Sequence, residues 1–323
     1  MGELIDGNWR RGGVESVLTD GQLRRPPSVF RDWVTPDGDG PFKPAPGRYH
    51  LYVSLACPWA HRTLIMRNLK GLGDLVGVSV VHWHMGDDGW TFDEGAGVVP
   101  DGVNGARFLH EIYTLSDPNC TSRVTVPVLW DKATGRIVSN ESADILRMFN
   151  TAFGGCGAAA GDYYPAAQRE EIDAINARVY ATLNNGVYRS GFATTQGAYE
   201  AAVAEVFQTL DWLEPRLAHQ RYLVGDRLTE ADIRLFTTLV RFDVVYHGHF
   251  KCNRRALTDY PALWAYTRDL YQHPAIRPTV DFHHIKAHYY GSHAWLNPSG
   301  IIPIGPDRDF ERISDRSNLA EGQ

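Results

Sequence analysis

The sequence predicts a small α/β domain followed by a larger all-helical domain. Strand and helix patterns alternate between residues 47 and 153, small residues dominate 154–161, and helical spacing of apolar residues runs from about 165 to 277. A length of 323 residues also fits two domains of ordinary size. We therefore expect an N-terminal arm over 1–46, a mixed-sheet domain over 47–153, and a helical domain with a C-terminal tail over 162–323.

The composition excludes several classes of protein. Hydrophobic residues make up 43% and charged residues 22%, which is an ordinary globular balance. The net charge of −6, without a basic block, argues against nucleic-acid and anionic-membrane partners. No stretch approaches the roughly 18 apolar residues of a membrane helix, and four cysteines in so long a chain are no disulfide scaffold. We expect a cytoplasmic protein.

The first elements follow a proline- and glycine-rich arm over 1–46. Residues 49–53 are typical of a strand, and Pro58 then suits the first turn of a helix that ends near Gly71. A second strand is expected over about 76–84. The glycine- and aspartate-rich segment 86–119 is predicted to be a long loop, and a loop of this length in a compact domain is usually functional or a family-specific insertion.

A second pair of strands follows the loop. Residues 125–131 predict a strand entered through Pro127, and 136–139 return antiparallel after a tight turn. The next helix is expected over 143–150. Strand–helix–strand followed by strand–strand–helix is the thioredoxin-like arrangement, with helices packed on a mixed sheet.

Cys57 stands where the first strand meets its helix. A thiol there faces unsatisfied backbone N–H groups and the positive end of the helix dipole, and both favour the thiolate. The position three residues later is Ala60, so a disulfide formed at Cys57 has no internal thiol to resolve it. The sequence therefore predicts a nucleophilic cysteine that is regenerated by an external, low-molecular-weight thiol.

Two further motifs point to the ligand. In thioredoxin-like sheets a proline at this strand entry is cis, so Pro127 is expected to turn the Val126 backbone towards Cys57, where it can pair with a peptide-like ligand. An ordinary edge-strand proline is the alternative. Glu141 and Ser142 at a helix start offer N–H groups, a hydroxyl and a carboxylate to an amino acid, although a bare pair of this kind more often caps the helix. Together these motifs fit glutathione.

With these residues in place, the chain resembles the glutathione transferase superfamily, and more closely the glutathionyl-hydroquinone reductases of the Xi class. The resemblance spans about 47–306 and is carried by an ordered series of motifs. They are Cys57-Pro58-Trp59-Ala60 within 51–62, Val126-Pro127 within 125–131, Asn140-Glu141-Ser142, Asn184-Asn185-Gly186-Val187-Tyr188, Thr229-Glu230-Ala231-Asp232 within 229–236, His249-Phe250-Lys251-Cys252-Asn253, and His288-Tyr289-Tyr290 within 288–293.

The resemblance implies roles for individual residues. Cys57 would be the nucleophile, Tyr188 the proton donor, and Tyr246 and Tyr289 would direct hydroxyls at the sulfur site. Glutathione would be contacted by Trp90, Arg123, Val124, Thr125 and Val126, with its γ-glutamyl end held by Glu141 and Ser142. Glutathione would be a co-substrate rather than a tightly bound cofactor, glutathionyl-hydroquinones would be the substrates, and the chain would form homodimers.

Other interpretations remain alongside this one. A transferase that conjugates glutathione to electrophiles would not use a protein thiol at this position, whereas a general thiol transferase, acting on dehydroascorbate or glutathionylated proteins, shares the cysteine. A non-catalytic interaction module is a third alternative. His284 and His288 have helical i, i+4 spacing but no acidic partner, so no metal site is expected. Thr229 and Asp232 are typical of a helix capping box.

Overall fold

The computed structural model describes residues 2–12 and 17–320, which form two compact units. Each unit combines segments that are distant in the sequence. The first unit comprises Met1–Ser16, Pro26–Gly161 and Asp281–Gly300, and the second comprises Val17–Arg25, Asp162–Val280 and Ile301–Gln323.

This division differs from the expected one at the arm and at the last helix. Residues 281–300, expected within the helical domain, belong to the first unit because His284 and His288 bond to backbone carbonyls there, those of Ala96 and Trp83. The arm is shared between the units. Its residues 17–25 belong to the second unit, and 26–46 belong to the first.

The first unit is built on a mixed sheet, four-stranded within the described residues, of order β6-β5-β7-β8. β6 runs parallel to β5, whereas β7 runs antiparallel to both β5 and β8. Every residue of β5 is buried, including the polar His50, as is typical of a strand that is covered on both faces. The strands are β5 (Tyr49–Val53), β6 (Val76–Val80), β7 (Val128–Asp131) and β8 (Arg136–Ser139).

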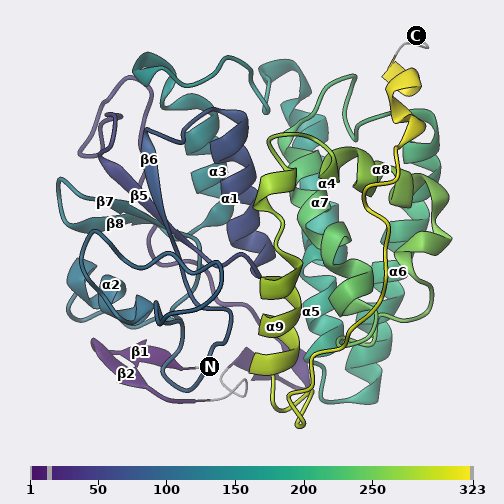
Figure 1. Ribbon diagram of the computed structural model, residues 1–323, viewed down its shortest axis with the longest axis horizontal. Helices are drawn as coiled ribbons and strands as arrows, with labels where there is room; N and C mark the ends of the chain where they lie inside the picture. Colours follow the sequence, from purple (N-terminus) through teal and green to yellow (C-terminus); the bar gives the residue numbers. More distant parts are fainter. Residues whose placement is uncertain (1, 13–16, 321–323) are drawn as a thin grey trace. The chain divides into compact units, whose positions relative to one another are not determined.

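Helix α1 (Pro58–Leu69) begins and ends as its sequence predicts. Pro58 occupies the first turn, where its missing N–H costs nothing. At the other end Gly71 has φ +60°, and its N–H and that of Leu72 bond back to the carbonyls of Asn68 and Arg67. In Figure 1, α1 and α3 (Ser142–Thr151) lie together on one side of the sheet, and α2 (Leu109–Ser116) lies on the other.

Helix α2 (Leu109–Ser116) lies inside the segment that was predicted to be a loop. Its buried side chains are Leu109, Ile112 and Tyr113, and the carboxylate of Glu111 accepts the N–H of Phe108. With only eight residues and no Ser, Thr, Asp or Asn at its start, it carries a weak helix signal. The second strand is also shorter than expected, because β6 ends at Val80 rather than near residue 84.

The arm contains two short antiparallel hairpins that were not predicted. One belongs to the first unit and is linked to it by Leu4, whose N–H and carbonyl pair with Ser122. The other belongs to the second unit, where the N–H of Thr194 bonds to the carbonyl of Gly21. The hairpin strands are β1 (Glu3–Ile5) with β2 (Asn8–Arg10), and β3 (Leu18–Thr19) with β4 (Gln22–Leu23).

The second unit is helical. Thr229 and Asp232 form the expected capping box at the start of α7, and Asp232 also accepts the hydroxyl of Tyr266. Among the described residues, no helix is both long and apolar enough to cross a membrane. The helices are α4 (Arg169–Val179), a π-helical turn (Tyr180–Asn184), α5 (Gly186–Gly191), α6 (Gln196–His219), α7 (Glu230–Arg241), a second π-helical turn (Phe242–Tyr246) and α8 (Pro261–Tyr271). α9 (Phe282–Ser292) belongs to the first unit.

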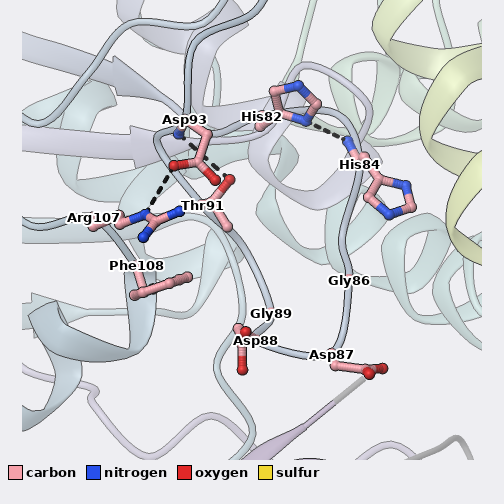
Figure 2. A pocket seen from close by; sticks show the side chains of 10 residues that line it. All are labelled: His82, His84, Gly86, Asp87, Asp88, Gly89, Thr91, Asp93, Arg107 and Phe108. Atoms are coloured by element: carbon pink, nitrogen blue, oxygen red, sulfur yellow. Dashed lines mark hydrogen bonds and ion pairs between the residues drawn. The ribbon is translucent and has the colours of Figure 1, made fainter.

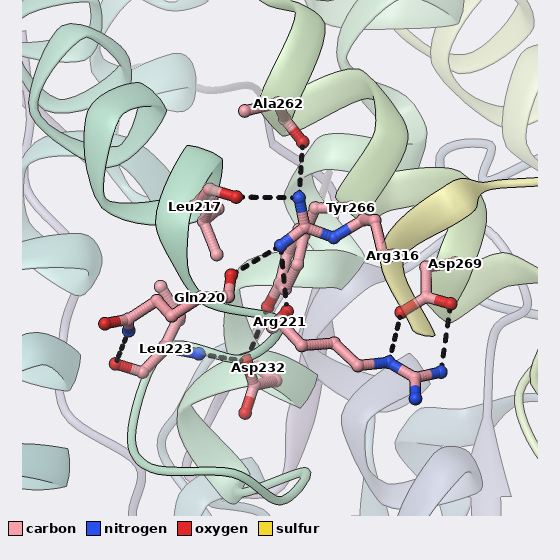
Figure 3. A network of polar contacts seen from close by, with 9 residues as sticks. All are labelled: Leu217, Gln220, Arg221, Leu223, Asp232, Ala262, Tyr266, Asp269 and Arg316. Carbon is pink, nitrogen blue, oxygen red and sulfur yellow. Dashed lines mark hydrogen bonds and ion pairs between the residues drawn. The ribbon is translucent and has the colours of Figure 1, made fainter. Parts of the chain in front are cut away.

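The C-terminal tail is tied to this helical unit by Arg316. Figure 3 shows its guanidinium directed at the carbonyls that end α6 and the segment after it. Nη1 donates to Leu217 at 2.7 Å, and Nη2 donates to Gln220 at 2.6 Å and to Arg221 at 3.0 Å. Arg316 is 4% exposed, so these hydrogen bonds are shielded from solvent. They satisfy carbonyl groups at the end of α6 that have no N–H partner within the helix.

Replacing Arg316 with alanine should lower the free energy of unfolding by about 2–4 kcal/mol, because buried carbonyls lose a charged donor. Urea unfolding measures this change. Arg312→Ala is the matched control, since that side chain is exposed and the hydrogen bonds of this residue with Arg268, Gln272 and Asp309 use its backbone groups, which alanine keeps. Equal stability of the two variants would contradict a stabilising role for Arg316.

Candidate functional site

Cys57 is the N-cap residue of α1, at the end of the turn that follows β5. Its N–H bonds to the Ser54 carbonyl at 3.2 Å, and its extended backbone (φ −77°, ψ 120°) directs the chain into the helix. The thiol is half-buried and lies 3.6 Å from the carbonyl oxygen of Val126. The sulfur therefore sits where the first N–H groups of α1 provide positive potential.

The peptide bond between Val126 and Pro127 is cis, as the sequence predicted. Val126 precedes β7, and its side chain is 5% exposed. The carbonyl of Val126 contacts Cys57, so the residue before the proline and the cysteine meet in the structure. Backbone groups beside a thiol can pair with an extended peptide whose own sulfur must reach that thiol.

Tyr113 of α2 supports this backbone, and the sequence analysis missed it. Its hydroxyl donates to the carbonyl of Thr125 at 2.8 Å and accepts the N–H of Thr125 at 3.1 Å. The side-chain amide of Asn140 donates to the same oxygen at 3.1 Å. Burial raises the pKa of Tyr113, so the phenol stays neutral and keeps the proton that it donates.

Glu141 and Ser142 stand at the start of α3. The carboxylate of Glu141 accepts the N–H of Ala143 at 3.1 Å, so it does cap the helix. Its other oxygen accepts the hydroxyl of Ser28 at 2.9 Å, which brings the arm to this helix start. Ser142 is 3% exposed. The cap and the positive end of α3 together form a polar corner that suits an amino acid with free α-groups.

The remaining predicted glutathione contacts lie on either side of α2. The carbonyl of Trp90 accepts the N–H of Leu109, the first residue of α2, at 2.9 Å. Arg123 and Val124 are half-buried and Thr125 is exposed. Burial lowers the pKa of Arg123, opposed by the charge of Glu3, and a partly desolvated guanidinium favours a carboxylate partner.

The structure brings two of the three predicted tyrosines together. Tyr188 of α5 and Tyr246 lie in the second unit with ring centroids 6.0 Å apart, and both pack on Phe250. The guanidinium of Arg25 lies 5.3 Å from the centre of the Tyr188 ring. Tyr289 belongs to α9 of the first unit and is 1% exposed.

A separate cavity of about 310 Å³ is lined mainly by loop residues on either side of Trp90 in the sequence (Figure 2). Arg107 pairs with Asp93 at 3.0 Å, and the N–H of His84 bonds to Nδ1 of His82. Burial lowers the pKa of His82, which favours a neutral imidazole. None of the predicted glutathione contacts lines this cavity. Its lining residues are His82, His84, Gly86, Asp87, Asp88, Gly89, Thr91, Asp93, Arg107 and Phe108.

No metal centre is found in the part of the chain that the structure describes. No group of three or more histidine, cysteine, aspartate or glutamate side chains there could hold a metal ion. His284 and His288 bond instead to the carbonyls of Ala96 and Trp83, at 2.7 and 2.9 Å.

Models of two sequence families match the chain. "Glutathione S-transferase, N-terminal domain" matches residues 56–152, and "Glutathione S-transferase, C-terminal domain" matches residues 196–269. Among curated proteins, a glutathionyl-hydroquinone reductase of Sphingobium chlorophenolicum is 57% identical over 98% of this chain and 100% of its own length.

Two solved structures are similar over almost their full lengths. The glutathione-bound structure of a glutathione transferase homologue from Escherichia coli K-12 is 52% identical, with a TM-score of 0.91, and covers 98% of this chain and 99% of its own. A Xi-class glutathione transferase from Natrialba magadii is 49% identical, with a TM-score of 0.92, over 99% and 97%.

Alkylation should distinguish the cysteines. Burial raises the pKa of Cys252 to about 12 and also raises that of Cys120, so both thiols stay protonated and shielded at pH 8. Cys57 and Cys156 are half-buried. We expect iodoacetamide to modify Cys57 in the native protein and to leave Cys120 and Cys252 untouched until the protein unfolds, as read by peptide mass spectrometry. Early modification of Cys252 with Cys57 intact would contradict this assignment.

Proposed function

Because the chain belongs to the glutathionyl-hydroquinone reductases of the glutathione transferase superfamily, we propose that it reduces glutathionyl-hydroquinones to hydroquinones with glutathione as the reductant. The observation that carries the proposal is the setting of Cys57: a thiol at the start of α1, 3.6 Å from the Val126 carbonyl, with Ala60 where a resolving cysteine would stand. Such a cysteine can accept a glutathionyl group but needs a second thiol to release it.

The first step transfers the glutathionyl group to the enzyme. The Cys57 thiolate attacks the sulfur of the substrate's thioether while the ring is in its keto form, so that the carbon–sulfur bond breaks and its electron pair leaves on the ring as an enolate. Tyr188 donates the proton that restores the aromatic hydroquinone. Tyr246 and Tyr289 direct their hydroxyls at the reacting sulfur and stabilise negative charge on it.

The second step regenerates the cysteine. The thiolate of a free glutathione attacks the glutathionyl sulfur of the mixed disulfide, and Cys57 leaves as a thiolate. The products are glutathione disulfide and the resting enzyme, so the two electrons that reduce the substrate come from two glutathionyl sulfurs. No tightly bound cofactor enters this scheme.

Residues of the first unit bind the glutathionyl group. The Val126 backbone pairs with the peptide, Trp90, Arg123, Val124 and Thr125 contact it, and Glu141 and Ser142 hold the γ-glutamyl end. Support for this arrangement comes from the cis peptide beside Cys57 and from the polar corner at the start of α3. We further propose that the enzyme works as a homodimer in the cytoplasm. A reducing compartment suits a chain in which none of the four cysteines forms a disulfide.

Comparing substrates tests the reaction class. The enzyme should turn over a glutathionyl-hydroquinone at least about tenfold faster than dehydroascorbate or a glutathionylated protein, and should not conjugate glutathione to a chlorinated nitrobenzene. Faster turnover of dehydroascorbate would assign a general thiol transferase instead. Conjugation that persists in a Cys57→Ser variant would assign an ordinary transferase.

Two variants separate the steps. Cys57→Ser should abolish turnover, whereas Tyr188→Phe should slow formation of the hydroquinone by about 10²-fold and leave release of the mixed disulfide by glutathione unchanged. Rapid single-turnover measurements resolve both rates. Tyr180→Phe, an exposed tyrosine of the same unit, serves as the control. Equal slowing of both steps in Tyr188→Phe would contradict a role in proton donation.

A further inference from the structure

The indole of Trp90 is covered by an imidazole from α9. The ring centroids of Trp90 and His288 are 4.8 Å apart and their planes meet at 28°, which is a stacked arrangement. Each of the two side chains is 7% exposed. The imidazole therefore limits how the indole can rotate.

The imidazole is itself held in place. Its Nδ1 lies 2.9 Å from the carbonyl oxygen of Trp83 and 3.3 Å from the hydroxyl oxygen of Ser292. Because a carbonyl only accepts hydrogen bonds, Nδ1 carries the proton. The Ser292 hydroxyl also accepts the N–H of Met85 at 3.0 Å, which ties the far end of α9 to the same segment.

His284, one turn earlier on α9, makes a second contact of this kind. Its Nε2 lies 2.7 Å from the carbonyl oxygen of Ala96, and its side chain is fully buried. Residues four apart share one face of a helix, so His284 and His288 together hold the chain on both sides of Trp90. Neither histidine has a role in the proposed reaction.

We propose that His288 is a positioning residue for glutathione, acting through Trp90. The inference rests on the proposed function, which assigns Trp90 to the glutathione site. A stacked imidazole fixed by a carbonyl keeps the indole in one orientation before the ligand arrives, so that binding does not have to order it. His288 acts on affinity and not on the exchange of sulfur bonds, because its ring stacks on the indole and meets the Tyr289 ring only edge-on, with centroids 5.2 Å apart.

His288→Ala should raise the dissociation constant of glutathione about tenfold, equivalent to about 1.4 kcal/mol, as measured by calorimetry on the full-length protein. The value of kcat at saturating glutathione and glutathionyl-hydroquinone should stay within about twofold of wild type. A purely structural role for His288 would not weaken glutathione binding while leaving kcat unchanged.

Two conservative variants identify the interaction. His288→Phe keeps a ring against Trp90 and should bind glutathione within about threefold of wild type, whereas His288→Gln keeps a donor for the Trp83 carbonyl but no ring and should bind like His288→Ala. The order of the glutathione affinities of these two variants tests the proposal even if the alanine variant does not fold. His283→Ala is the matched control, because this exposed histidine of α9 contacts Trp83 rather than Trp90 and should leave affinity unchanged.

The outcomes separate this inference from the proposed function. Unchanged affinity in His288→Ala, or rescue by Gln and not by Phe, would overturn the role of the stacked ring while wild-type turnover stands. A wild-type protein that neither binds glutathione nor turns over glutathionyl-hydroquinone would overturn the proposed function itself.

Discussion

The contact between the Cys57 sulfur and the Val126 carbonyl is the interaction on which the proposed glutathione site depends. The cysteine is placed by a helix start, and the carbonyl by the cis peptide before β7. The two belong to segments about seventy residues apart that the mixed sheet brings within 3.6 Å. In the proposed function, a peptide that pairs with the Val126 backbone presents its own sulfur to the thiol, so binding and chemistry share one geometry.

Buried polar contacts support this geometry from several directions. The neutral hydroxyl of Tyr113 forms hydrogen bonds with the backbone of Thr125 and the side chain of Asn140, which join α2, the strand entry and the start of α3. Ser28 of the arm bonds to Glu141, the cap of α3. Groups of this kind are costly to bury without partners, and when satisfied they favour one arrangement of the backbone.

Short-range sequence patterns predicted the strand and the helix that position Cys57. The buried run of β5, the proline that opens α1 and the glycine that ends it are each readable from a few neighbouring residues. The cis peptide at Pro127 and the capping box at Thr229 were also predicted and are confirmed.

Weak or long-range signals account for what was missed. Helix α2 has eight residues and no ordinary N-cap, although Glu111 three residues after Phe108 is a signal that could have found it. The partners of His284 and His288 are backbone carbonyls about two hundred residues earlier, which no local pattern specifies. The assigned roles of Tyr188, Tyr246 and Tyr289 came from family resemblance and stay predictions.

The most direct test of the account is the mass of the enzyme after reaction with a glutathionyl-hydroquinone in the absence of free thiol. The proposed mechanism predicts one added glutathionyl group, located on the peptide that contains Cys57 and lost when glutathione is supplied. Formation of the hydroquinone with the enzyme's mass unchanged, or a full single turnover by a Cys57→Ala protein, would contradict it.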